Sequence, residues 1–91
     1  MNDYSKGRVA LILVNPRHPF DTSKQRKLLE GLGGVVHTLD ASTHDAGEWI
    51  THAGVDELPA LIMLRNGKHV ATLPVREMKG RSFNKKLEAW T

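Results

Sequence analysis

The chain has 91 residues, a mass of 10.1 kDa and a formal net charge of +3, with 40% hydrophobic and 25% charged residues. This length and composition predict one folded domain over residues 1–91, with an ordered core of about residues 8–90. The chain contains no cysteine, which excludes disulfide bonds, zinc–thiolate sites and every reaction that needs a cysteine thiolate. It also lacks a run of about 18 apolar residues and a signal-peptide core, so we expect a cytoplasmic protein with no membrane partner.

Charge is distributed unevenly along the chain. Residues 1–27 hold six Lys and Arg against two Asp, a net charge of +4. Residues 28–64 hold six Asp and Glu and no Lys or Arg, and residues 65–91 hold seven Lys and Arg against two Glu, which gives net charges of −6 and +5. A fold built from such blocks could be strongly dipolar and steer charged partners, although the same pattern also suits ordinary solvated faces.

The first part of the chain predicts a strand, a helix and a second strand. Residues 8–15 read RVALILVN, a short and almost wholly apolar run that is typical of a strand buried on both faces of a sheet. After a turn with two prolines, residues 24–32 predict a helix that begins at a cap within residues 21–23 and ends at a group of glycines. Residues 35–39 predict a strand parallel to the first. The leucines expected on the buried stripe of the helix are Leu28, Leu29 and Leu32.

The middle of the chain predicts a second helix, capped by Ser42 or Thr43 and ended by Gly54. Its apolar residues recur with the spacing of one helical face. These residues are Ala46, Trp49, Ile50 and Ala53. Residues 58–64 then predict a third strand, with Pro59 near its start.

A hairpin and a last helix complete the predicted fold. Asn66-Gly67 predicts a tight turn between the third strand and an antiparallel strand over residues 69–73. Residues 74–80 predict a loop, and Ser82 is expected to cap the last helix, whose apolar stripe is Phe83, Leu87 and Trp90. The order β-α-β-α-β-β-α predicts an α/β fold with a four-stranded mixed sheet and helices on both faces.

This order of elements resembles the thioredoxin fold, in its minimal glutaredoxin form, and three stretches carry the resemblance. Residues 54–62 are similar to the family's segment ahead of the third strand, where a cis-proline faces the active-site turn; the matching bond is Leu58–Pro59. Residues 64–68 resemble the family's Asn-Gly hairpin. Glutaredoxins place Cys-Pro-[Phe/Tyr]-Cys after the first strand, and the matching positions here, which follow Arg17, are His18, Pro19, Phe20 and Asp21.

The departures from the family pattern decide what chemistry the resemblance can imply. His18 and Asp21 stand where the family has its two cysteines, and thiol–disulfide exchange needs a thiolate. Dithiol oxidoreductase activity is therefore excluded. Asn15 stands where related glutaredoxins carry a glutathione-binding Lys, and residues 75–80 do not match the family's Gly-Gly-x-Asp-Asp segment.

The resemblance implies that a docking groove remains although electron transfer is lost. We expect a redox-inactive protein-binding or accessory module that is not an enzyme, needs no cofactor and has another protein as its partner. Its contact surface would combine Leu58 and Pro59, the loop of residues 74–80 and the degenerate turn, in which an exposed Phe20 would serve as an apolar anchor. The residues of that turn are Arg17, His18, Pro19, Phe20 and Asp21.

Two alternatives remain open at this point. One is a small-ligand binder or enzyme that holds an anion, or a glutathione-like molecule, at the helix start within residues 16–23 with Arg17 and His18. The other is a nucleic-acid partner, which five aromatic residues without a stacking stripe do not favour. Its binding surface would be a basic patch of Arg76, Lys79, Arg81, Lys85 and Lys86, with Lys6 and Arg8 beside it.

Histidines raise a metal hypothesis that the spacing does not favour. His44, Glu48 and His52 recur every four residues on one helical face, but a zinc site needs three or four converging ligands and a tight signature. We therefore expect a solvated polar face and no metal site.

Overall fold

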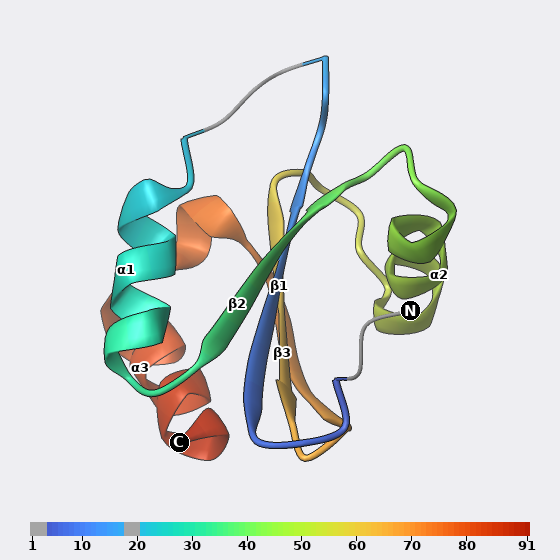
Figure 1. Ribbon diagram of the computed structural model, residues 1–91. Helices are drawn as coiled ribbons and strands as arrows, with labels where there is room; N and C mark the ends of the chain where they lie inside the picture. Colours follow the sequence, from blue (N-terminus) through green and yellow to red (C-terminus); the bar gives the residue numbers. More distant parts are fainter. Residues whose placement is uncertain (1–3, 18–20) are drawn as a thin grey trace.

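The computed structural model describes residues 4–17 and 21–91 of the chain (Figure 1). The predictions made for His18, Pro19 and Phe20 lie outside the described residues. The elements in chain order are β1 (Arg8–Val14), α1 (Ser23–Gly31), β2 (Val35–Asp40), α2 (His44–Ala53), β3 (Ala60–Arg65), β4 (Lys68–Pro74), the 3-10 helix η1 (Val75–Glu77) and α3 (Gly80–Trp90).

The four strands form one mixed sheet in the order β2-β1-β3-β4. β1 and β2 are parallel, whereas β3 is antiparallel to both β1 and β4. The β3–β4 turn has Asn66 at a φ of 51° and Gly67 at 80°, which is the backbone geometry that an Asn-Gly hairpin supplies. The predicted fold class and strand directions are confirmed.

Helices cover both faces of the sheet (Figure 1). α1 and α3 lie on one face, where Leu29, Phe83 and Trp90 pack on Ala10 and Ile12 of β1. α2 lies on the other face, where its apolar side packs on the alternate residues of β1 and β3. Because successive side chains of a strand point to opposite faces, the central strands β1 and β3 supply both cores and must be apolar throughout.

Helix boundaries correct several sequence predictions. Leu28 is 45% exposed rather than part of the buried stripe, whereas Leu29 is fully buried and Leu32 packs against the core. Ser82 lies inside α3 and does not cap it; α3 begins at Gly80 with Lys79 at the N-cap position and no side-chain cap. Part of the predicted loop over residues 74–80 is the short helix η1. No helix within residues 4–17 and 21–91 has the length and apolar character needed to cross a bilayer.

Candidate functional site

The ends of three strands meet at one end of the sheet. Ala60 at the start of β3 pairs with Leu13 near the end of β1 and with Pro74 at the end of β4. The segments that leave these strands therefore lie close together, as the sequence predicts for the turn after β1, the Leu58–Pro59 segment and the loop after β4. We call Asn15, Asp56, Glu57, Leu58, Pro59 and Arg76 the rim.

Leu58 and Pro59 form the centre of the rim. The peptide bond between them is cis, which is the isomer expected from the sequence. The Pro59 carbonyl accepts a hydrogen bond of 3.0 Å from the Val75 N–H, which fixes the segment against the end of β4. Among the hydrogen bonds within residues 4–17 and 21–91, none uses the backbone N–H or C=O of Leu58.

A shallow acidic cavity adjoins Leu58. Its volume is about 350 Å³. The carboxylates of Asp56 and Glu57 lie beside the apolar side chains of Ile50 and Val55 in its lining, which Asn15 and Leu58 complete. A surface of this kind offers apolar contact and negative charge next to an unpaired backbone.

The described part of the degenerate turn is organised by two side-chain acceptors. The Asn15 Oδ1 accepts a hydrogen bond of 2.9 Å from the Arg17 N–H. The Asp21 Oδ1 accepts bonds from the Ser23 hydroxyl at 2.6 Å and the Ser23 N–H at 3.0 Å, and these bonds hold the pKa of the Asp21 carboxyl below its ordinary value. Asp21 is thus ionised at neutral pH and places negative charge at the start of α1, which disfavours the anion site considered for residues 16–23.

An ion pair links the rim to η1. The Arg76 Nε donates to the Glu57 Oε2 at 2.6 Å. This bond raises the pKa of the Arg76 guanidinium above its ordinary value. The pair is exposed, so its role is to orient the two side chains rather than to stabilise the fold.

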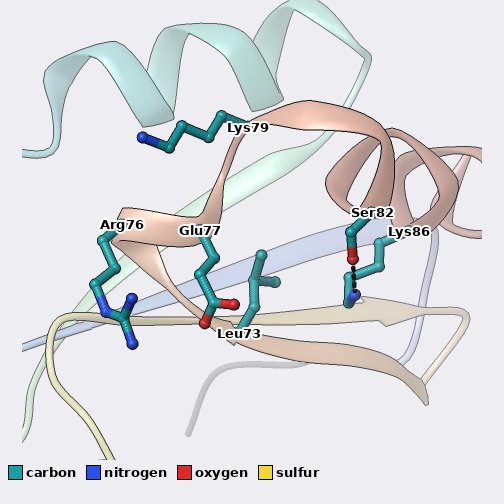
Figure 2. Close-up of a pocket in the computed structure, with 6 residues that line it drawn as sticks. All are labelled: Leu73, Arg76, Glu77, Lys79, Ser82 and Lys86. Atoms are coloured by element: carbon teal, nitrogen blue, oxygen red, sulfur yellow. Dashed lines mark hydrogen bonds between the residues drawn. The ribbon is translucent and has the colours of Figure 1, made fainter.

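The predicted basic patch divides in the structure. Arg76, Lys79 and Lys86 line one cavity together with Leu73, Glu77 and Ser82 (Figure 2). Arg81 and Lys85 do not line it. The last helix and first strand are neighbours as predicted, but Arg8 is not a free phosphate contact, because its guanidinium donates to the carbonyls of Leu32 and Thr91.

The histidines on α2 do not converge into a metal site. His44 pairs with Glu48 at 3.1 Å, whereas the His52 ring packs edge-on against Trp49. No group of three or more metal-binding side chains occurs among residues 4–17 and 21–91.

Sequence reasoning missed an aromatic cluster on the α2 face. The Tyr4 ring lies 5.2 Å from the His37 ring and 5.9 Å from the Trp49 ring, measured between centroids. The polar N-terminal segment carries no periodic signal that would place Tyr4 against the second layer. The only hint in the sequence is that Tyr4 is an aromatic residue in an otherwise polar segment.

Comparisons with known proteins identify the fold but no close relative. No protein-family model matches the chain, and no curated protein matches it. A designed protein is similar at 15% identity, with a TM-score of 0.62, over 92% of this chain and 80% of its own. The short form of thioredoxin F from spinach chloroplast is similar at 16% identity and a TM-score of 0.58, over 93% and 74% of the two chains. A mutant thioredoxin from Halobacterium salinarum is similar at 16% identity and a TM-score of 0.57, over 94% and 76%.

These similarities show a thioredoxin-like fold. The chain has no cysteine, so it lacks the thiolate that disulfide exchange requires. The chain therefore has this fold without the side chains of dithiol chemistry.

Proposed function

We propose that this chain is a redox-inactive, thioredoxin-like module that binds another protein at the rim. The observation that supports this most directly is the Leu58 backbone, whose N–H and C=O have no hydrogen-bond partner in the described chain. An extended peptide segment can pair with such a backbone as an added strand would. The same segment would lie next to the acidic cavity.

Charge would orient the bound segment. The carboxylates of Asp56 and Glu57 lie next to Leu58. Arg76 forms an ion pair with Glu57. A peptide that extends from the two carboxylates to Arg76 would therefore place a basic residue near Asp56 and an acidic residue near Arg76. Such complementarity sets orientation and association rate more than affinity.

Site-specific photo-cross-linking in the native cell tests this proposal. A photoreactive residue replaces Arg17 or Asp56 near the rim in two variants, and replaces Thr51 or Ala89 in two matched controls. All four positions are exposed, and neither control position belongs to the rim or lines the acidic cavity. We expect one protein to be cross-linked from both rim positions and from neither control position.

The competing outcomes are separable. Cross-linking of one protein equally from all four positions, or from the control positions alone, would place the contact surface elsewhere. Arg17→Glu should also reduce the amount of partner recovered, because it reverses the charge of a residue in the degenerate turn. Reproducible reduction of a protein disulfide by the purified chain would contradict the redox-inactive assignment.

A further inference from the structure

We propose that the cavity between β4, η1 and α3 binds a phosphate group carried by a small organic molecule. We call it the η1–α3 cavity; it has a volume of about 360 Å³, within the range of small-molecule sites. Its lining residues are Leu73, Arg76, Glu77, Lys79, Ser82 and Lys86. This site shares Arg76 with the rim but does not depend on the protein-binding function proposed above.

The two terminal nitrogens of the Arg76 guanidinium are not used by its bond to Glu57. The bond to Glu57 uses only Nε, so it leaves both terminal nitrogens of Arg76 available. Two parallel N–H donors of one guanidinium match two oxygens of a phosphate group. Glu57 thus acts as a positioning residue for Arg76 at the edge of this cavity.

Ser82 and Lys86 supply the opposite side of the cavity. Figure 2 shows them facing each other from α3, with Leu73 lying between this pair and Arg76. The Lys86 Nζ donates to the Ser82 Oγ at 3.2 Å, and Lys86 is half-buried. Because Ser82 accepts this bond, its own hydroxyl proton is free to point at a ligand oxygen.

The charge balance of the lining favours an anionic ligand. Three cationic side chains, Arg76, Lys79 and Lys86, stand against the single carboxylate of Glu77. Counting Glu57, which pairs with Arg76 at the edge of the cavity, the excess is one positive charge. This excess attracts an anion, and a phosphate monoester differs from a carboxylate in its three terminal oxygens, which can meet Arg76, Ser82 and Lys86 together.

The wider fold places this cavity in a positive field. α1 carries three basic residues and one acidic residue, and residues 75–90, which form η1 and α3, carry five basic and two acidic residues. α1 and α3 lie on the same face of the sheet (Figure 1). Residues 40–58, which form α2 and its flanking loops, carry five acids and no Lys or Arg. The layer formed by α1 and α3 is therefore mainly basic and the α2 layer mainly acidic, so an anion is attracted to the α1–α3 side.

The size and exposure of the η1–α3 cavity set the expected ligand and affinity. The apolar Leu73 side chain offers contact for the organic part of an ester. Since the cationic groups are largely solvated, we expect weak binding that falls as ionic strength rises.

A titration with two phosphate ligands tests the proposal. Amide and side-chain NMR shifts are followed while O-phosphoserine or inorganic phosphate is added to the full chain at constant ionic strength. We expect the ester to shift Arg76, Lys79, Ser82 and Lys86 and to bind at least as tightly as inorganic phosphate. Glutarate serves as the carboxylate comparison and should bind more weakly than either.

Two adjacent lysines provide a matched pair of variants. Lys86→Gln removes a charge that lines the cavity, whereas Lys85→Gln removes the same charge from a residue outside it. We expect Lys86→Gln to weaken O-phosphoserine binding about fivefold or more and Lys85→Gln to weaken it less than about twofold. The unliganded spectra of both variants should remain those of the folded protein.

Three results would overturn the site. Equal weakening by the two variants would mean that the ligand senses only the diffuse field of the helix layer. An absence of shifts at the lining residues would remove the site, and glutarate binding as tight as the ester would remove the phosphate assignment. None of these measurements involves a protein partner, so failure here and failure at the rim are distinguishable.

Discussion

The indole N–H of Trp90 donates a buried hydrogen bond of 2.8 Å to the carbonyl oxygen of Leu64. It also approaches the Val9 carbonyl at 3.3 Å. One side chain at the end of α3 therefore ties that helix to both central strands. Trp90 is fully buried, and its ring also lies against Gly34, in the turn between α1 and β2.

Replacing the indole by a phenyl ring should destabilise the fold measurably. Trp90→Phe keeps an aromatic ring but removes the donor to Leu64, and a buried hydrogen-bond group left without its partner costs about 1–3 kcal/mol. Urea unfolding measures the free energy. An unchanged midpoint would mean that the indole N–H contributes nothing to the attachment of α3.

A substitution that adds a side chain should destabilise the fold at position 34 but not at position 31. A Cβ at Gly34 would overlap the Trp90 ring, but a Cβ at Gly31 would meet nothing within 4 Å. We expect Gly34→Ala to cost about 1–3 kcal/mol through overpacking. Gly31→Ala, at the end of α1, should be neutral or stabilise by up to about 1 kcal/mol. Equal effects of the two substitutions on the thermal midpoint would contradict this difference.

The two glycines show what local sequence patterns can and cannot predict. Both read as signals for the end of a helix, and α1 does end at Gly31. Gly34 must lack a side chain because the Trp90 ring occupies the adjacent space. Trp90 is far away in the sequence, so no residue near Gly34 indicates this contact. The prediction that Leu28 is buried is wrong for a related reason. Periodicity identifies an apolar stripe on a helix but not the width of that stripe, which depends on the neighbouring elements.

The sequence predicts those parts of the candidate site whose positions depend on the backbone and on the order of the strands. The position of Leu58 and Pro59 beside the end of β4 follows from strand order and the hairpin. The Glu57–Arg76 pair and the separation of Lys86 from Lys85 were not predictable, because exposed side chains pair according to distances that only the folded chain supplies.

Capping of α2 and α3 gives a paired test of the corrected helix starts. The Thr43 Oγ1 accepts a hydrogen bond of 3.3 Å from the Ala46 N–H and so caps α2. We expect Thr43→Ala to lower the free energy of unfolding by about 1 kcal/mol, as loss of an N-cap does. Ser82→Ala, which the sequence alone would predict to be equally costly, should change it by less than about 0.5 kcal/mol. A larger loss for Ser82→Ala, measured by urea unfolding, would restore the original cap prediction.

The contribution of Asp40 should depend on pH in a defined direction. Its carboxylate accepts bonds from the Ser42 hydroxyl at 2.7 Å and the Ser42 N–H at 2.8 Å. These bonds lower the pKa of Asp40 below its ordinary value of 3.8. Because the folded-state pKa lies below the unfolded-state pKa, the stabilisation is complete above the unfolded value and is lost as pH falls through the folded one.

Asp40→Asn keeps a neutral acceptor but removes the ionised form. The variant should therefore melt below the parent chain at pH 7, and the gap should close at an acidic pH below the folded-state pKa of Asp40, where the parent's carboxyl is also protonated. Ser42→Ala removes the hydroxyl donor and should raise the pKa of Asp40 toward its ordinary value, which a carboxyl NMR titration measures. A gap in the thermal midpoint that stays constant between the two pH values would show that ionisation of Asp40 adds nothing to the fold.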